Sequence, residues 1–311
     1  MKALAFIVAA VVALGWPWVY FNHYFIHIGV MTGIGATLAL SVNLMLRMGQ
    51  LSLAHAAFMG LGAYASALMA MRLKLPVLAA MPLAALGVAL LAVLLGPIFL
   101  RIKGVYFVLL TFAFGEVVNL IFQAWVDVFG GNNGLFGVPK LSALGYRLAD
   151  VRFYYVFALI LAALAYAAVS RLYRSEVGSI MDSLEENEEL SRSLGIDALR
   201  HRIAVFGLSG FLAGLCGGLY AHYIGFLSPE AFSFWTVVNV VVINVIGGVA
   251  SPLGPMLGAV LLVPLPELLR DAKQYQVLSY GALLMAFLLF LPNGLVGLRE
   301  SFRRKKKAGA Q

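Results

Sequence analysis

The residue whose type and position most suggest chemistry in this sequence is an acid inside an apolar run. Glu116 lies in "LLTFAFGEVVNLIF", and Asn119 follows it by about one helical turn. A carboxylate in such a run is costly to bury, so it usually faces a cavity, a transport pathway or a hydrogen-bonding partner. Two interpretations stay open. Glu116 makes a structural hydrogen bond between helices, with Asn119 helping to satisfy it, or it lines a pathway.

Polar side chains in other apolar runs are open to the same two interpretations. Polar groups in membrane spans should face partners or a cavity. On this ground the candidate pathway residues are Ser52, His55, Glu116, Asn119, Asn239 and Asn244. For each of these residues, a role in helix packing fits the sequence at least as well as a role in a pathway.

The sequence does not indicate an enzyme or a metal site. It has no Gly-x-x-x-x-Gly-Lys-[Ser/Thr] loop to hold the phosphates of ATP, and its five histidines are scattered. Its one cysteine, Cys216, lies in an apolar run and can form neither an internal disulfide nor a cysteine-based metal site. We therefore predict no catalytic residue, no metal site and no cofactor bound by this chain.

One strongly charged stretch interrupts the apolar runs. Residues 183–202 read "SLEENEELSRSLGIDALRHR". A short charged helix tethered between two membrane helices can dock on a soluble partner and carry its movement into the membrane. On charge alone, a solvated loop with charge pairs four residues apart is the alternative.

The elements that must position these residues are apolar helices. Hydrophobic residues make up 62% of the 311 residues and charged residues 12%, against roughly 25% charged residues in soluble domains. Because a spanning helix needs about 20 apolar residues, the sequence predicts an all-α polytopic membrane protein with about ten spans. The predicted spans are 3–20, 24–46, 50–71, 76–99, 105–125, 153–170, 203–224, 234–250, 254–270 and 277–293. Polar and glycine residues within 50–71 and 234–250 indicate that these two are broken or re-entrant.

The basic residues predict the orientation of this bundle. With ten spans and the C-terminal "RRKKK" in the cytoplasm, fifteen basic residues lie on the cytoplasmic side and seven on the other. Both termini are then cytoplasmic, in a bacterial-type inner membrane. The predicted parts are a transmembrane domain (1–298), with a cytoplasmic coupling segment at about 175–202, and a basic cytoplasmic tail (299–311). Topology accounts for the net charge of +8, so we expect no nucleic-acid partner.

Two further patterns concern helix packing. "GQLSLAHAAF" (49–58) and "GFLSPEAFSF" (225–234) share Gly-x-Leu-Ser and run in opposite directions on this layout. They predict an internal repeat of inverted topology, with chance similarity as the alternative. Glycines at helical spacing predict close packing of helices, and they are Gly207, Gly210, Gly214, Gly218, Gly254 and Gly258.

Five motifs, in order along the chain, carry a resemblance to a known family. They are "GQLSLAHAAFMGLGAYASAL" (49–68), "RIKGVYFVLLTFAFGEVVNLI" (101–121) with "GGNNGLFGVP" (130–139), "ENEELSRSLGID" (186–197), "FLAGLCGGLYAHYIGFLSPEAFSF" (211–234) and "VIGGVASPLGPMLGAVLL" (245–262). From about residue 40 to 298 the chain resembles the permease subunits of branched-chain amino acid ABC importers, of the LivM type.

The resemblance implies a subunit driven from outside itself. Its implied partners are a second related permease subunit, two cytoplasmic ATP-binding subunits that use ATP and Mg²⁺, a periplasmic substrate-binding protein and the lipid bilayer. The implied cargo is branched-chain amino acids or related small solutes. Permeases for urea, amides or other small organic solutes are the alternative, followed by a stand-alone secondary transporter or channel and a membrane enzyme.

The resemblance also assigns coupling residues. The family pattern Glu-Asn-Glu…Leu-Gly falls on Glu186, Asn187, Glu188, Leu194 and Gly195. Glu185 stands where many members have a basic residue, and Leu190 and Ser191 stand where alanine is common. The segment is therefore more acidic than usual, which leaves its individual contacts with an ATPase open.

Overall fold

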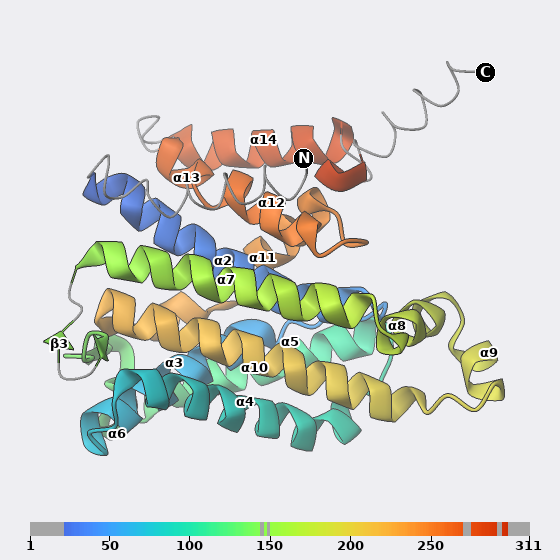
Figure 1. Ribbon diagram of the computed structural model, residues 1–311, viewed down its shortest axis with the longest axis horizontal. Coiled ribbons are helices and arrows are strands. Elements are labelled where there is room, and N and C mark those ends of the chain that lie inside the picture. The colour runs from blue at the N-terminus through green and yellow to red at the C-terminus, as the bar shows by residue number, and fades with distance from the viewer. Residues whose placement is uncertain (1–21, 144–145, 148–149, 270–274, 291–293, 298–311) are drawn as a thin grey trace.

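A computed structural model describes residues 22–143, 146–147, 150–269, 275–290 and 294–297. The predicted first span (3–20) and the basic tail (299–311) lie outside these residues. Helices dominate the described part, and its strands are only two residues long (Figure 1). The helices are α2 (His23–Leu46), α3 (His55–Arg72), α4 (Val77–Phe99), α5 (Val105–Ala124), α6 (Val126–Phe129), α7 (Val151–Tyr173), α8 (Glu176–Glu186), α9 (Glu188–Ser193), α10 (Ala198–Ile224), α11 (Phe234–Gly247), α12 (Leu253–Leu262), α13 (Leu265–Leu268) and α14 (Gln276–Phe290), with 3-10 turns η1 (Gly131–Asn133) and η2 (Pro229–Phe232).

The predicted spans within the described residues coincide with helices. The span at 50–71, predicted to be broken or re-entrant, becomes helical only at His55, after a non-helical stretch. The span at 234–250, predicted likewise, is one helix that ends at Gly247. One break was not predicted. The span predicted at 254–270 is two helices, α12 and α13, separated at Val263 and Pro264. Proline has no backbone N–H to donate to the preceding turn, so it commonly ends or kinks a helix.

Five of the described helices are long and apolar enough to cross a membrane, namely α2, α4, α5, α7 and α10. The apolar helices α11, α12–α13 and α14 are shorter. The chain is therefore an all-α, multi-pass membrane protein. Ten complete spans are more than the described helices establish.

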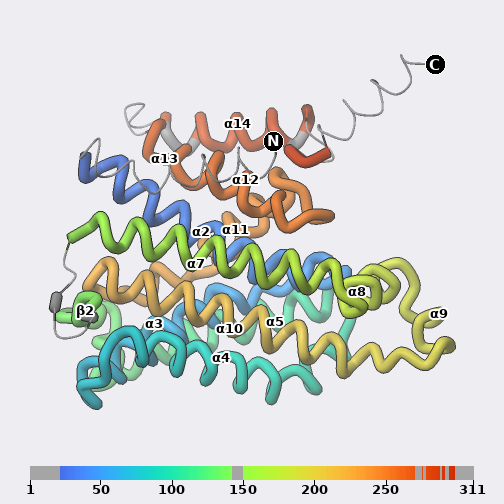
Figure 2. Tube along the Cα trace, in the orientation of Figure 1, coloured from blue at the N-terminus to red at the C-terminus, as the bar shows by residue number. Residues whose placement is uncertain are grey.

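The most buried helices form the centre of the bundle. Helix α10 packs on α4, α3 and α2, and α7 packs along α2 (Figures 1 and 2). In the most apolar stretch of each helix, 67% of the residues are buried in α2 and α10 but only 28% in α5. Helix α5 therefore presents most of its surface outward from the chain.

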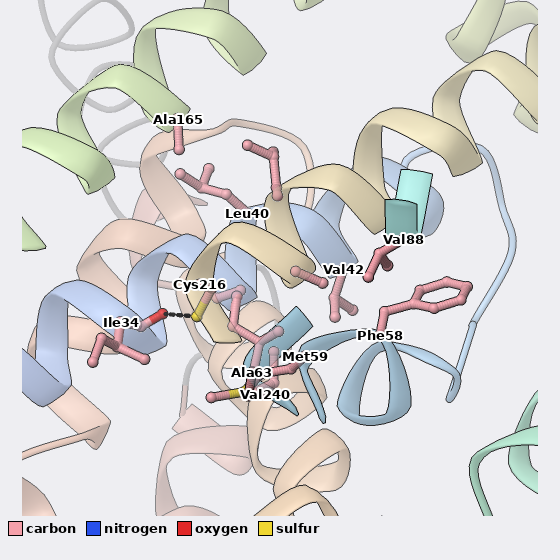
Figure 3. Close-up of a cluster of buried hydrophobic side chains, with 14 of the residues drawn as sticks. Ile34, Leu40, Val42, Phe58, Met59, Ala63, Val88, Ala165, Cys216 and Val240 are labelled. Carbon is pink, nitrogen blue, oxygen red and sulfur yellow. Dashed lines mark hydrogen bonds between the residues drawn. The ribbon is translucent and has the colours of Figure 1, made fainter. Parts of the chain in front are cut away.

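The core between α2, α3 and α10 is built from apolar side chains of mixed size, among them Leu40, Met59 and Ala63 (Figure 3). Cys216 of α10 is fully buried there, and its thiol donates a hydrogen bond of 3.2 Å to the Ile34 carbonyl of α2. Glycines let α10 approach α3 closely. A Cβ on Gly217 would strike the Met59 carbonyl, and a Cβ on Gly62 would strike the backbone of Gly214. Interfaces with small residues of this kind are typical of helices packed in membranes.

The two ends of the bundle differ. Helices α8 and α9 lie at one end, here called the α9 end, and α6 lies with the short strands at the other, the α6 end (Figure 1). At the α6 end, β1 (Leu135–Phe136) pairs antiparallel with β4 (Phe226–Leu227). This pairing ties the connection after α5 to the connection after α10. A second pair joins β2 (Ser142–Ala143) and β3 (Tyr146–Arg147).

Candidate functional site: an anchored helix pair and a polar cavity

Helices α8 and α9 form a compact pair outside the apolar bundle. Asn187 lies between them in an extended conformation, and its side chain caps α9 by accepting a hydrogen bond of 3.0 Å from the Leu190 amide. Ser191 is buried, with its hydroxyl 2.9 Å from both the Ser183 and the Asn187 carbonyl oxygens. Capping by Asn and these side-chain contacts fix the angle between the two helices.

Glu188 anchors α9 to the rest of the chain. Its Oε2 lies 2.6 Å from Lys103 Nζ, in the connection between α4 and α5, and 2.9 Å from Arg202 Nη2, in the first turns of α10. Its Oε1 lies 2.7 Å from Arg192 Nη2. Burial alone would raise the pKa of Glu188, but hydrogen bonds from Lys103 and Arg202 and their charges outweigh it and hold the pKa below its usual value. The carboxylate therefore stays charged and joins three segments.

A second ion pair anchors α8 to α2. Arg47 Nε and Nη2 donate to the two carboxylate oxygens of Asp182 at 2.6 and 2.7 Å. The guanidinium also stacks on the Tyr173 ring, 3.9 Å from its centroid. The hydrogen bond to Asp182 is the main reason that the pKa of Arg47 is raised. Paired donors of this kind fix geometry as well as charge, so α8 is held against the ends of α2 and α7.

The outward face of α9 is apolar at its centre. Leu190 and Leu194 are 59% and 75% exposed, although both lie outside the apolar spans. Gly195 follows with a φ of +88°, and a Cβ there would meet nothing within 4 Å. Glu185 and Glu186 are exposed at the end of α8. Of the coupling residues assigned from the resemblance, Glu188 thus turns inward and Leu194 turns outward.

The second site is a cavity of about 550 Å³ between α5 and the segment that joins α10 to α11. We call it the α5 cavity. Its lining is mostly polar and consists of Glu116, Asn119, Gln123, Asn132, Ser228, Pro229, Glu230, Ser233, Phe234 and Trp235. Its volume is within the range of about 300–1,000 Å³ typical of small-molecule sites.

A polar stripe on α5 forms one wall of this cavity. Glu116, Asn119 and Gln123 are three and four residues apart, which puts them on one face of a helix. Asn119 is buried, donates to the Pro229 carbonyl at 2.8 Å and accepts from the Gln123 amide at 2.5 Å. Glu116 is half-buried, and the described part of the chain offers it no ion pair. Helical spacing could have added Gln123 to the candidates from sequence alone.

The remaining candidate pathway residues lie elsewhere. Ser52 and His55 are buried at the start of α3, with His55 Nδ1 3.3 Å from the Ser52 carbonyl oxygen. Asn239 is exposed and accepts a hydrogen bond of 3.4 Å from Tyr280 of α14. Asn244 is buried and donates to the Ala39 carbonyl of α2 at 3.0 Å. The structure thus groups Glu116 with Asn119 and separates them from the other four.

The candidate packing glycines all face nearby atoms. On α10, a Cβ at Gly207, Gly210, Gly214 or Gly218 would lie within about 3.1 Å of an atom of α4. On α12, a Cβ at Gly254 would strike the Gly248 carbonyl, and one at Gly258 would strike the Ile243 carbonyl of α11.

The two Gly-x-Leu-Ser segments share their local geometry. Gly49 and Gly225 follow α2 and α10 with φ values of +70° and +78°. Three residues later, Ser52 and Ser228 each accept a hydrogen bond of 3.4 Å from the amide two residues ahead. Each segment therefore leaves a helix through a glycine of positive φ and reaches a serine whose hydroxyl accepts from the backbone.

Comparisons with known proteins assign a family to nearly the whole chain. Residues 24–292 match the family described as "Branched-chain amino acid transport system / permease component". The chain is 32% identical to the high-affinity branched-chain amino acid transport system permease protein LivM of Salmonella typhimurium, over 97% of this chain and 76% of that protein. It is also 32% identical to the LivM protein of Escherichia coli, over 100% of this chain and 79% of that protein.

More distant relatives are also permease proteins. A probable LivM protein of Methanocaldococcus jannaschii is 26% identical over 70% of this chain and 71% of its own length. No solved structure matches the chain. Because the family match covers most of the sequence, including the charged helix pair and the α5 cavity, the chain belongs to the permease components of branched-chain amino acid transport systems.

Proposed function

We propose that this chain is a membrane-spanning subunit of an ATP-driven importer in the inner membrane. It translocates branched-chain amino acids or related small solutes that a periplasmic binding protein delivers. Membership of the permease family and the likeness to LivM proteins support this cargo. Urea, amides and other small organic solutes remain the alternative cargo.

The anchored helix pair carries the proposal that ATP-binding subunits drive this chain. Leu190 and Leu194 form an exposed apolar face on a segment that Glu188 holds to the α4–α5 connection and to α10. Burying such a face requires a protein partner, and the ion pairs would carry the partner's movement into α5 and α10. Two cytoplasmic subunits that bind ATP and Mg²⁺ are the partners we infer, and this chain itself binds neither.

A second permease subunit completes the proposed membrane part. The chain is 24% identical, over 58% of its length, to a probable LivH permease protein of Methanocaldococcus jannaschii. One face of α5 is apolar and exposed, with Val105, Tyr106 and Leu109 between 56% and 76% exposed. Such a face beside a polar cavity suits a related permease that closes the pathway from the other side.

The proposed topology has ten spans, two related halves of opposite orientation and both termini in the cytoplasm. The matching geometry of Gly49–Ser52 and Gly225–Ser228 supports the inverted repeat. Basic residues at the α9 end, such as Arg47, Lys103 and Arg202, support a cytoplasmic location for that end. The transmembrane domain is then 1–298, with the coupling segment at about 175–202 and a basic tail at 299–311.

Co-purification tests the coupling role. The chain is purified from detergent-solubilised membranes of its own host as the wild type and as the double variant Leu190→Ser/Leu194→Ser. Losing two exposed leucines from the interface removes several kcal/mol of apolar burial, so we expect the recovered ATP-binding subunit to fall by about tenfold or more.

Leu73→Ser is the matched control, because Leu73 is also exposed, at 66%, but lies after α3 at the α6 end. It should leave recovery of the ATP-binding subunit unchanged. Equal recovery with the wild type and the double variant would refute the assignment of α9 as the coupling helix.

A further inference from the structure

We propose that the α5 cavity binds the ammonium group of an amino acid in transit, with Glu116 and Glu230 as its counter-charges. This inference rests on the proposed function and adds a specificity role for this chain. The permease would then read the amino group of the cargo for itself, after the binding protein has released it.

The charge of the cavity lining is the first argument. The lining contains two carboxylates and no lysine, arginine or histidine. In the part of the chain that the structure describes, no salt bridge includes Glu116 or Glu230. A carboxylate within an apolar span is costly unless a charge partner reaches it. A passing ammonium group supplies that partner, whereas a ligand of net negative charge, such as a carboxylate without an amino group or a phosphate, would be repelled.

The second argument is that the neighbouring amides are already occupied. Asn119 uses its amide to bind the Pro229 carbonyl and its oxygen to accept from Gln123. The first of these hydrogen bonds ties α5 to η2, and the second lies within α5. The carboxylates of Glu116 on α5 and Glu230 on η2 then line the same space from two separate elements, and both are free to meet a ligand.

The third argument is the presence of an apolar wall next to the charges. Phe234 and Trp235, at the start of α11, line the cavity. Phe234 is fixed by an edge contact with Phe112 of α5, with ring centroids 5.1 Å apart. Trp235 is 70% exposed. A ligand with a cationic end and an aliphatic end can therefore satisfy both parts of the lining, as an aliphatic amino acid does.

The test uses the purified transporter complex, with all its membrane and ATP-binding subunits but without the binding protein. Radiolabelled leucine is bound to the complex and displaced either by leucine or by 4-methylpentanoate, which has the same carbon skeleton without the amino group. A charged hydrogen bond is worth about tenfold to a hundredfold in affinity. We expect leucine to displace the label at least about tenfold better than 4-methylpentanoate in the wild type.

The variants separate charge from structure. Glu116→Gln should cut the preference for leucine to about threefold or less, and Glu116→Asp, which keeps the charge, should retain it. Asp127→Asn is the matched control, since Asp127 lies just beyond α5 and does not line the cavity. If Glu116→Gln prevents assembly, Glu230→Gln decides in its place, because Glu230 is exposed.

Three results would overturn the inference. These are an unchanged preference in Glu116→Gln, the same loss in Asp127→Asn, and a wild-type complex that binds the two compounds equally or does not bind leucine. Failure of the proposed function would look different. The wild-type complex would then lack an ATP-binding subunit, or its ATP hydrolysis would not respond to the loaded binding protein.

Discussion

Glu188 and Leu194 belong to one short helix and its cap, yet they face opposite ways. Glu188 binds Lys103, Arg192 and Arg202, and Leu194 is 75% exposed. A sequence motif lists both together and cannot separate the residue that holds the helix from the residue that meets a partner. The distinction follows from side-chain direction along the helix, and it assigns the two residues different experimental phenotypes.

Replacing Glu188 should weaken the fold before it weakens any contact with a partner. Glu188→Gln leaves the guanidinium of Arg202, whose side chain is 5% exposed, without its carboxylate. Removing one partner of an ion pair that is mostly buried, but that water can partly reach, costs about 1–3 kcal/mol. We expect a lower thermal unfolding midpoint for the purified chain. Glu189→Gln on the exposed face of α9 is the control and should unfold like the wild type.

The same carboxylate predicts how stability depends on pH. The pKa of Glu188 in the folded chain lies below its usual value of 4.5. Its contribution to stability is therefore complete above about pH 4.5 and is lost as the pH falls through the lower, folded-state pKa. The difference in unfolding midpoint between wild type and Glu188→Gln should be constant from neutral pH to about pH 5 and shrink below that. A difference that grows on acidification would contradict the ion pairs.

At the scale of elements, the crossing of α3 and α10 depends on the absence of side chains. A Cβ at Gly217 would strike the Met59 carbonyl, which belongs to a helix backbone and cannot move alone. Gly217→Ala should therefore destabilise the purified chain by about 1–3 kcal/mol, measured as a drop in the thermal unfolding midpoint.

Gly87 provides the matched control for this substitution. It lies within α4, and a Cβ there would meet nothing within 4 Å. Gly87→Ala should be neutral or slightly stabilising, because alanine is the better helix former. A similar loss of stability in both variants would contradict close packing at Gly217 as the cause, because helix propensity favours alanine at both positions.

The sequence predicted the helices well and their interruptions in part, since the non-helical start of the 50–71 span was expected. Apolar runs bounded by turn residues placed α4 and α5 almost to the residue, since length and hydropathy determine spans. The break between α12 and α13 was not predicted, although Pro264 and Pro266 lie there. Proline is also found inside α4, at Pro82 and Pro97, without ending that helix. Packing against neighbouring helices therefore decides which proline breaks a helix, and one sequence does not contain that information.

The candidate site could be predicted only in part, because the sequence does not show which distant segments a polar side chain will contact. Polar residues in apolar runs pointed to Glu116 and Asn119, which do line a common cavity. The same rule also selected Asn244, which binds the Ala39 carbonyl of α2. Whether a polar side chain meets a cavity or a carbonyl depends on contacts far apart in sequence. Glu230 lies 114 positions after Glu116 and could be joined to it only by the fold.

At the scale of the whole molecule, the bundle has the anchored helix pair α8 and α9 at one end and a polar cavity on α5, but the sequence has no ATP-binding loop. We therefore expect the purified chain alone, in liposomes, to show neither ATP hydrolysis nor gradient-driven leucine flux. Reconstitution with its partner subunits and binding protein should give ATP-dependent uptake. Flux through the chain alone that disappears in Glu116→Gln would favour a stand-alone transporter.

Because Cys216 is buried between α2 and α10, the native chain is a suitable background for mapping membrane topology with introduced cysteines. This is the only cysteine in the sequence, and it is fully buried, so a membrane-impermeant maleimide has no thiol to modify. One new cysteine at an exposed position then reports its side of the membrane without prior removal of native thiols. Lys140→Cys should react in intact spheroplasts, and Ser193→Cys only in inverted vesicles from cells that lack the ATP-binding subunits, which would otherwise cover α9. The opposite pattern would mean that the chain has the reverse of the proposed orientation in the membrane. The helices themselves would be unchanged.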